Sequence, residues 1–207
     1  MQPLSYMVPT PQMTSGKPLV LASTSPYRRA LLEKLRLPFK CVSPDADERP
    51  VSGETVEQMV VRLAQLKATS VAADHPDALI IGSDQSAELN GTILSKPGNR
   101  ENARRQLQAS SGQTITFHTG LCLLNTASGA MQSLCEPYSV VFRDLDDGFI
   151  DRYLDAEQPY DSVGSFRSEG LGISLFERFE GDDPNTLIGL PLIRLQQMLR
   201  AEGIDIL

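Results

Sequence analysis

The sequence lacks the residue patterns of a zinc site, a disulfide framework or a membrane anchor. Its two histidines, His75 and His118, do not form a metal-binding pair. Its three cysteines are odd in number and lack metal-ligand spacing, so we expect free thiols in a reducing compartment. No apolar run approaches the roughly 18 residues of a membrane span, and residues 1–16 lack the pattern of a signal peptide. We therefore expect a soluble, cytoplasmic protein without membrane contact.

Basic charge is also scarce. The chain has 19 lysines and arginines against 26 aspartates and glutamates, which gives a formal net charge of −7. Nonspecific binding of nucleic acid needs a basic face, so we expect no nucleic acid partner, and any phosphate site must be local. The 207 residues, 41% of them hydrophobic, fit one domain with two lobes around a cleft. We expect residues 1–16, which contain several prolines, to be a flexible extension of a domain over residues 17–207.

The segment 19–29 predicts an anion site at the start of a helix. An apolar run ends at Ala22, Ser25 suits the N-cap and Pro26 the first helical position. This places Arg28 and Arg29 in the first turn, where the helix dipole disfavours cations unless an anion is present. Free backbone N–H groups, the two guanidinium groups and the hydroxyls of Ser23 and Ser25 would together bind a phosphate. The alternative is an exposed basic first turn with ordinary capping.

A predicted helix over residues 55–73 contains one anomalous residue. Thr55 and Gln58 form a capping box, and apolar residues such as Val56 and Leu63 mark a buried face. Lys67 lies within about 20° of Val56 on that face. Its aliphatic stem could pass along the core to reach water, or its ammonium could point into a cleft and meet an anion. The helix pattern leaves both explanations open.

The next segment predicts a strand that positions a carboxylate. Residues 78–81 form an apolar run, and Asp84 and Gln85 follow at the end of the strand where ligands bind in open α/β sheets. Asn90-Gly91 predicts a two-residue hairpin whose register places Gln85 opposite Lys96. If that pairing persists to the base of the hairpin, Lys96 lies close to Asp84. A surface ion pair of at most about 1 kcal/mol is the alternative.

The rest of the chain is typical of an α/β protein. Patterns predict helices over residues 101–109, 144–156 and 191–202, and a long hairpin of strands over residues 114–124 and 133–143. A glycine-rich stretch, 164–172, predicts a loop that can approach a ligand closely, although it fits neither a Walker loop nor a dinucleotide fingerprint. A last strand is expected over residues 173–179.

Several short motifs together resemble one known family. They are the run Leu21-Ala22-Ser23-Thr24-Ser25-Pro26-Tyr27-Arg28-Arg29, Asp47-Glu48, Leu63-Ala64 with Lys67-Ala68, Ile81-Gly82-Ser83-Asp84-Gln85, Lys96-Pro97, Ser168-Glu169-Gly170 and Gly189-Leu190-Pro191. In order and spacing they resemble the Maf family of nucleoside triphosphate pyrophosphatases, from Lys17 to the C-terminus. The resemblance implies a mixed α/β fold related to inosine triphosphate pyrophosphatases, with two lobes around a cleft.

The resemblance also implies a role for each unusual residue. Hydrolysis of the α-β phosphoanhydride bond releases a monophosphate and diphosphate, and needs negative charge to be neutralised around the attacked phosphorus. Asp84 is expected to accept the proton of the attacking water, with Lys67 and Lys96 as further catalytic groups. Glu48 is expected to act with Asp84 as a ligand of Mg²⁺ or Mn²⁺, or as a second acid, unless it is a solvated loop residue. Phosphates would contact Ser23, Ser25, Arg28 and Arg29.

Three positions bear on the substrate. Tyr27, Gln85 and Glu169 are similar to the branch of the family that acts on 7-methyl-GTP, whereas the dTTP and UTP branch has arginine, threonine and glutamine there. N7 methylation makes the base cationic, which an aromatic ring and a carboxylate would favour. In departure from that branch, Tyr27 replaces tryptophan and Ser95 replaces a glycine before Lys96. Tyr27 as a packing residue and Glu169 as a solvated one are the alternatives.

The sequence thus predicts an enzyme that removes 7-methyl-GTP from the nucleotide pool, with a nucleoside triphosphate as its ligand. A dTTP/UTP pyrophosphatase is the alternative within the family. A non-catalytic nucleotide-binding regulator of cell division is an alternative from another class, although a pure binder gains nothing from a carboxylate beside a polyphosphate. The sequence leaves a homodimer open.

Overall fold

The structure is a computed structural model that describes residues 16–207. The flexible extension predicted over residues 1–16 therefore lies outside the described residues, apart from Gly16. Among residues 16–207 no helix combines the length and the apolar character needed to cross a membrane.

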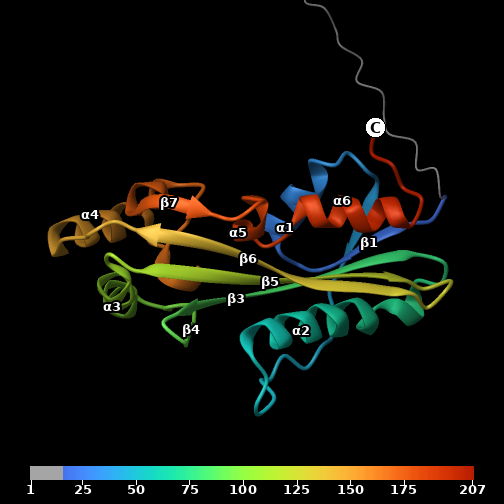
Figure 1. The fold of residues 1–207 in the computed structure, drawn as a ribbon, viewed down its shortest axis with the longest axis horizontal. Helices are drawn as coiled ribbons and strands as arrows, with labels where there is room; N and C mark the ends of the chain where they lie inside the picture. Colours follow the sequence, from blue (N-terminus) through green and yellow to red (C-terminus); the bar gives the residue numbers. More distant parts are fainter. Residues whose placement is uncertain (1–15) are drawn as a thin grey trace, which may run out of the picture.

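The fold is a mixed β-sheet covered by helices on both faces (Figure 1). This arrangement confirms the predicted α/β fold class. The seven-stranded sheet has the order β2-β1-β3-β5-β6-β7, and β4 pairs with β3 beside this path. β1 is parallel to β2 and β3, and all other pairs are antiparallel. The strands are β1 (Leu19–Ala22), β2 (Phe39–Val42), β3 (Leu79–Leu89), β4 (Thr92–Leu94), β5 (Thr114–Asn125), β6 (Met131–Phe142) and β7 (Phe176–Glu180).

The helices divide between the two faces and the two ends of the sheet. α2 covers one face, α1 and α6 cover the other, and α3 and α4 lie at the far end of the long strands (Figure 1). Short 3-10 helices span Ala72–Asp74, Val163–Ser165 and Leu171–Leu175. The α-helices are α1 (Pro26–Glu33), α2 (Val56–Ser70), α3 (Arg100–Ser110), α4 (Asp147–Glu157), α5 (Asn185–Ile188) and α6 (Leu192–Ala201).

Separate hydrophobic clusters give the molecule its two lobes. In one lobe, alternate residues of β3 pack on opposite faces, Leu79 against the α6 side and Ile80 against the α2 side. In the other lobe, Phe117 and Phe142 of β5 and β6 pack with residues of α3 and α4. Because β3, β5 and β6 contribute to both lobes, these long strands fix the lobes relative to each other.

The two helix starts that carry predicted site residues form as expected. The Ser25 side chain accepts a hydrogen bond from the amide of Arg28, and Pro26 is the first residue of α1. Thr55 and Gln58 form the capping box of α2. The sequence pattern therefore correctly predicts where α1 and α2 begin. These starts position the first turn of α1 and the face of α2 that carries Lys67.

Two later boundaries differ from the prediction. α4 begins at Asp147 with Asp146 as its N-cap, because the carboxylate of Asp146 accepts the amide hydrogen bond of Phe149. The expected cap was Asp144. The last strand begins at Phe176 instead of residue 173, since a 3-10 helix occupies Leu171–Leu175.

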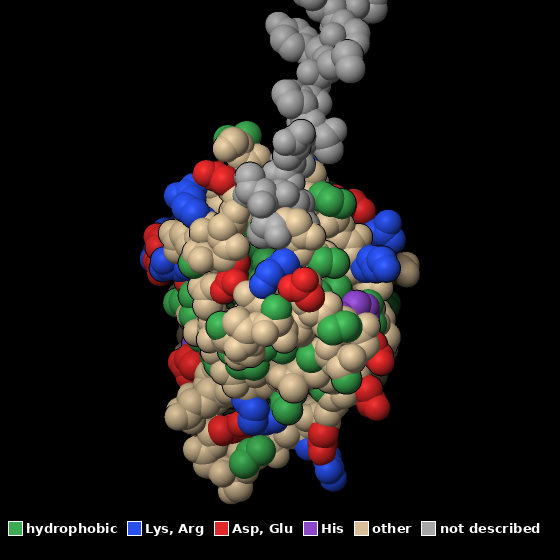
Figure 2. All heavy atoms as spheres, turned by 90° about the vertical axis from the view of Figure 1, so that its right-hand side faces the viewer, with side chains coloured by type: hydrophobic (Ala, Val, Ile, Leu, Met, Phe, Trp, Pro, Cys, Tyr) green, Lys and Arg blue, Asp and Glu red, His purple; other side chains and the backbone are tan. Residues whose placement is uncertain are grey.

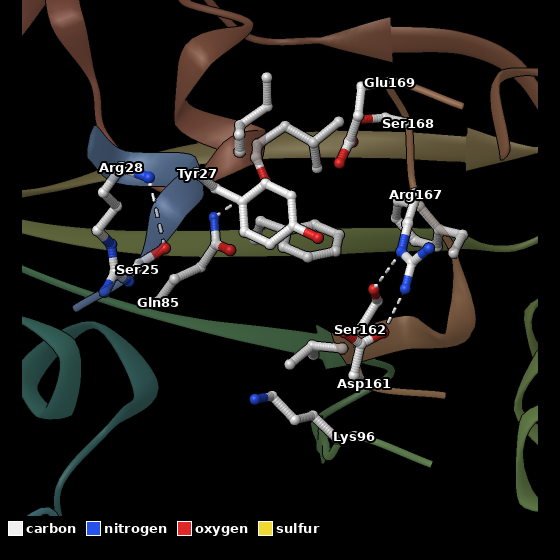
Figure 3. A pocket seen from close by; sticks show the side chains of 15 residues that line it. Ser25, Tyr27, Arg28, Gln85, Lys96, Asp161, Ser162, Arg167, Ser168 and Glu169 are labelled. Atoms are coloured by element: carbon white, nitrogen blue, oxygen red, sulfur yellow. Dashed lines mark hydrogen bonds and ion pairs between the residues drawn. The ribbon is translucent and has the colours of Figure 1, made fainter. Parts of the chain in front are cut away.

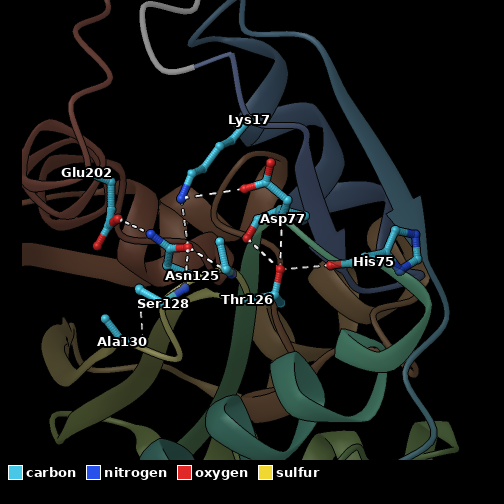
Figure 4. A network of polar contacts seen from close by, with 10 residues as sticks. Lys17, His75, Asp77, Asn125, Thr126, Ser128, Ala130 and Glu202 are labelled. Atoms are coloured by element: carbon cyan, nitrogen blue, oxygen red, sulfur yellow. Dashed lines mark hydrogen bonds and ion pairs between the residues drawn. The ribbon is translucent and has the colours of Figure 1, made fainter.

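A polar network closes the end of the molecule remote from α4 (Figure 4). The Lys17 ammonium donates to Asn125 Oδ1 at 2.9 Å, and Asn125 Nδ2 donates to Glu202 Oε2 at 2.6 Å. Thr126 Oγ1 donates to the carbonyl oxygen of His75 at 2.8 Å. These bonds tie the chain before β1 and the β5–β6 turn to the end of α6. Figure 2 shows basic and acidic side chains interspersed on this end of the molecule.

Two glycines let α2 approach the sheet closely. A Cβ atom on Gly82 would lie 2.0 Å from the carbonyl oxygen of Ala64, and one on Gly120 would lie 2.0 Å from that of Val60. Gly120 is the cross-strand partner of Asp84. The absence of side chains at these positions therefore brings the backbone of α2 next to the carboxylate predicted to be catalytic.

We expect Gly120→Ala to lower the free energy of unfolding by about 3 kcal/mol, because α2 must move away from the sheet. Gly148→Ala in α4 is the control, since its added Cβ would meet side-chain atoms alone, at 3.3 Å, and no backbone atom, so it should change stability much less. Urea unfolding measures both variants. An unfolding midpoint of Gly120→Ala equal to that of the wild type would contradict the close packing.

Candidate active site

The sheet has an open edge where β3 passes between its two short neighbours. β1 pairs with β3 only as far as Leu21 opposite Ile81, and β4 begins its pairing at Ala87 opposite Leu94. Among the described strands none pairs with residues 82–86 on this side, although β5 pairs with them on the other. The prediction placed residues 82–85 at the C-terminal end of a strand, whereas β3 continues through them to Leu89. What ends there is its parallel partner, β1.

Two neighbouring cavities, of about 420 and 300 Å³, share part of their lining and adjoin this open edge. We call the larger one the charged chamber, because the charged residues Glu48 and Lys67 line it, together with Ser23. We call the smaller one the aromatic chamber, because Phe117 and Phe166 line it with Gln85 and Glu169. The residues that line both chambers, all labelled in Figure 3, are Ser25, Tyr27, Arg28, Lys96 and Asp161.

Lys67 joins two carboxylates beside the charged chamber. Its Nζ lies 2.6 Å from Asp84 Oδ1 and 2.9 Å from Glu48 Oε1. Lys67 and Asp84 are 7% and 8% exposed, whereas the Glu48 side chain is 58% exposed. The Lys67 ammonium therefore meets anions. Of the two explanations that the sequence left open, this is the one in which the ammonium contacts an anion and does not reach water along the core. Lys67 lines the chamber, whereas Asp84, which Lys67 contacts, is not part of the lining.

Arg28 lies on the opposite side of the charged chamber from α2. Its Nε donates to the carbonyl oxygen of Gly189 at 2.9 Å, and the Ser83 hydroxyl donates to the same oxygen at 2.9 Å. Burial lowers the pKa of the Arg28 guanidinium, and the nearby charges of Asp84 and Glu48 act in the opposite direction. The guanidinium stays charged at neutral pH, since arginine is not deprotonated in proteins.

The structure brings only one of the two adjacent arginines to the cleft. Arg29 is exposed, lines neither chamber and pairs with Glu33 through Nε at 3.0 Å. Successive residues of a helix point about 100° apart, and here Arg28 lies toward the cavity while Arg29 lies toward Glu33. Ser23 and Ser25 do line the charged chamber, and Ser23 Oγ accepts the amide hydrogen bond of Ser25 at 3.1 Å.

Lys96 reaches the cleft by a different route from the one that the hairpin register suggested. The hairpin forms with Leu89 opposite Thr92, as predicted, but its pairing ends at Ala87 opposite Leu94. Lys96 lies beyond β4, is exposed and lines both chambers. Within residues 16–207 the ion-pair partner of Asp84 is Lys67, and the expected pair of Asp84 with Lys96 does not form.

The aromatic chamber contains the three predicted specificity residues. Tyr27, which is 44% exposed, and Glu169, also exposed, line it together with Gln85. The walls include Phe117 and Phe166, whose rings pack edge to face with centroids 5.6 Å apart. The chamber therefore combines an apolar wall with many polar and charged side chains.

The hydrogen bonds of Gln85 determine which of its amide atoms is available. Nε2 donates to Thr119 Oγ1 at 2.9 Å and to the carbonyl oxygen of Thr186 at 2.7 Å. These partners occupy the donor side of the amide and leave Oε1 as its atom for a ligand; Figure 3 shows the Gln85 side chain beside Ser25 and Tyr27 in the cavity lining. Gln85 therefore presents a hydrogen-bond acceptor to the chamber.

Two cleft residues were missed by the sequence analysis. Arg167 lies in the glycine-rich loop that was predicted to approach a ligand, but nothing distinguished it from its neighbours there. Asp161 precedes that loop and carries no motif signal. Their ion pair, Arg167 NH2 to Asp161 Oδ1 at 2.5 Å, raises the pKa of Arg167 and lowers that of Asp161. Only the folded structure brings this pair next to Lys96 and Tyr27.

The carboxylates of Asp84 and Glu48 are the groups that could hold a metal. Their hard oxygen atoms suit Mg²⁺ or Mn²⁺. In the described part of the chain no cluster of three or more histidine, cysteine, aspartate or glutamate side chains could hold an ion by itself. Because Mg²⁺ needs only one or two carboxylates when substrate phosphates complete its shell, this donor set fits a metal bound jointly with phosphates.

The fold resembles solved structures of two bacterial Ham1 proteins. The Ham1 protein of Staphylococcus aureus is 16% identical, with a TM-score of 0.51 over 90% of this chain and 100% of that chain. A HAM1 protein from Coxiella burnetii is 17% identical, with a TM-score of 0.51 over 90% of this chain and 98% of that chain. At these identities the likeness shows the fold.

The sequence itself matches a family model. The model, described as "Maf-like protein", covers residues 18–202, which include all the motifs noted in the sequence. The match confirms the predicted family and supports a nucleotide pyrophosphatase in general, without selecting a substrate. The chain belongs to the Maf-like protein family.

Proposed function

We propose that this protein hydrolyses the α-β phosphoanhydride bond of a nucleoside triphosphate and releases diphosphate. The observation that carries the proposal is the contact of one buried ammonium, Lys67, with both Asp84 and Glu48 beside the charged chamber. The adjoining aromatic chamber supplies apolar walls for a base. A triphosphate beside Lys67 and a base between the aromatic side chains would use both chambers at once.

The charged chamber offers the cations that such a substrate needs. Lys67, Arg28 and Lys96 line it, together with the Ser25 hydroxyl at the start of α1. Negative charge on the triphosphate and on the departing diphosphate would be neutralised by these groups, which the fold positions before the substrate arrives. The helix N-terminus adds backbone N–H donors and the positive end of its dipole.

Asp84 is the proposed proton acceptor for the attacking water. Its Oδ1 is bound by Lys67 in the structure. Substrate phosphates compete for that ammonium, because charge-assisted bonds to phosphate are strong, and this competition would free the Asp84 carboxylate for the water. Glu48, on the exposed side of Lys67, would remain an ion-pair partner of the lysine or join Asp84 in holding Mg²⁺ or Mn²⁺. When bound, the cation supplies further positive charge at the phosphates.

The proposed substrate is 7-methyl-GTP, which would leave 7-methyl-GMP after hydrolysis. The methylated base is a cation, so the exposed ring of Tyr27 and the carboxylate of Glu169 would favour it over a neutral base. The acceptor that Gln85 presents suits the N–H groups on the Watson–Crick edge of guanine. A dTTP or UTP pyrophosphatase would be the outcome if these contacts do not select the base.

We expect Asp84→Asn to lower kcat for diphosphate release from 7-methyl-GTP by about 10³-fold, because the amide cannot accept the proton of water. Asp74→Asn, at an exposed carboxylate outside the cleft, is the control and should retain activity. Steady-state assays with Mg²⁺ and with Mn²⁺ measure both. Wild-type turnover in Asp84→Asn would remove Asp84 from the mechanism, and tight binding without turnover in the wild type would favour the nucleotide-binding regulator.

Glu169→Gln tests the choice of base. Loss of the carboxylate charge should lower the ratio of kcat/KM for 7-methyl-GTP to that for UTP by about fivefold, a size set by the solvent exposure of Glu169. Glu177→Gln on the exposed face of β7 should leave the ratio unchanged. An unchanged ratio in Glu169→Gln would show that the carboxylate does not read the base.

A further inference from the structure

Asp161 lies at the junction of the two chambers. It is one of the residues that line both chambers. In any nucleoside triphosphate the sugar connects the base to the phosphates. If the base enters the aromatic chamber and the phosphates enter the charged chamber, the junction of the two chambers receives the sugar.

The residues at this junction divide into donors and one charged acceptor. Ser25, Arg28 and Lys96 offer donors that suit the phosphate next to the sugar. Asp161 is the only carboxylate among the residues shared by the two chambers. A carboxylate repels phosphate oxygens, but it accepts hydrogen bonds from hydroxyl groups. Its chemistry therefore matches the sugar and not the triphosphate.

Arg167 holds Asp161 in place across the cleft from α1 (Figure 3). The guanidinium binds Asp161 through NH2 at 2.5 Å, and its Nε donates to Ser162 Oγ at 3.4 Å. The Arg167 backbone is fixed in turn, since its amide donates to the Tyr153 hydroxyl at 3.3 Å. One N–H donor on Oδ1 leaves a carboxylate with further acceptor capacity, which is available for hydroxyl groups in the cleft.

We propose that Asp161 accepts hydrogen bonds from the vicinal 2′- and 3′-hydroxyls of ribose, so that the cleft selects ribonucleotides over 2′-deoxyribonucleotides. This inference rests on the proposed function only in placing a nucleoside triphosphate across the two chambers. The Asp161 carboxylate is ionised at neutral pH, as an aspartate ordinarily is, and the hydrogen bond from Arg167 lowers its pKa further. A 2′-deoxy sugar offers one hydroxyl fewer to this acceptor.

Binding of two uncleavable analogues tests the proposal without requiring catalysis. The probes are 7-methylguanosine 5′-(α,β-methylene)triphosphate and its 2′-deoxy counterpart, measured by titration calorimetry on the full chain with Mg²⁺. We expect the wild type to bind the ribose form about 10-fold more tightly, as one hydrogen bond to a charged acceptor supplies. Asp161→Ala should reduce this preference to about twofold or less, and Asp161→Asn, which keeps an amide oxygen, should give an intermediate value.

Asp155→Ala is the matched control. The Asp155 side chain is 68% exposed and pairs with Arg100 at 3.0 Å, which closely matches the 67% exposure and the arginine partner of Asp161. This variant should keep the full ribose preference. The preference of Asp161→Ala for 7-methylguanine over uracil should also persist, which shows that the loop carrying Glu169 is still in place.

The outcomes separate the sugar assignment from the proposed function. Equal affinities for the two analogues in the wild type, or an undiminished ribose preference in Asp161→Ala, would overturn the sugar assignment whatever the rate of hydrolysis. A ribose preference that Asp161→Ala abolishes supports it even if the wild type releases no diphosphate from 7-methyl-GTP, a result that contradicts the proposed function alone. If neither analogue binds, both proposals fail.

Discussion

The contact of Lys67 with Asp84 is the interaction on which the rest of the site depends. A lysine on the buried face of a helix is costly unless an anion meets its charge, and here the anion comes from the middle of β3 at 2.6 Å. The two groups can meet because Gly82 and Gly120 let the backbone of α2 lie against the sheet. Truncation of Lys67 would remove the ion-pair partner of the buried Asp84 carboxylate. The same pair that shapes the site therefore also favours the close packing of α2 on the sheet.

The open edge of β3 explains how one ligand could reach both halves of the cleft. Successive residues of a strand point to opposite faces of the sheet, and Asp84 contacts α2 while the neighbouring Gln85 contacts the backbone of α5. Inside a sheet these two side chains would be separated by the adjacent strand. Where β1 has ended and β4 has not yet begun, no strand intervenes on that side within residues 16–207. A single molecule at this edge can therefore meet a carboxylate from one face and an amide from the other.

The sequence predicted the parts of this arrangement that depend on local chemistry. The N-cap at Ser25 and the capping box at Thr55 follow from hydrogen bonds within a few residues, and Lys67 stood out because it broke an apolar helix face. The predicted contact of Asp84 with Lys96 was wrong. It assumed that the hairpin pairing continues past Leu94, but the chain leaves the sheet there. Asp161 gave no signal at all, since its place at the junction of the chambers arises from tertiary packing alone. Local patterns do not encode such long-range juxtapositions.

The most direct test of the account is to identify the products formed from 7-methyl-GTP. Phosphorus NMR of a complete reaction with Mg²⁺ distinguishes the possible bonds, because cleavage at the α-β bridge yields one 7-methyl-GMP and one diphosphate per substrate. The account predicts these two products in equal amounts and no inorganic phosphate. Release of inorganic phosphate with 7-methyl-GDP would place the attack at the other end of the triphosphate and contradict the central claim.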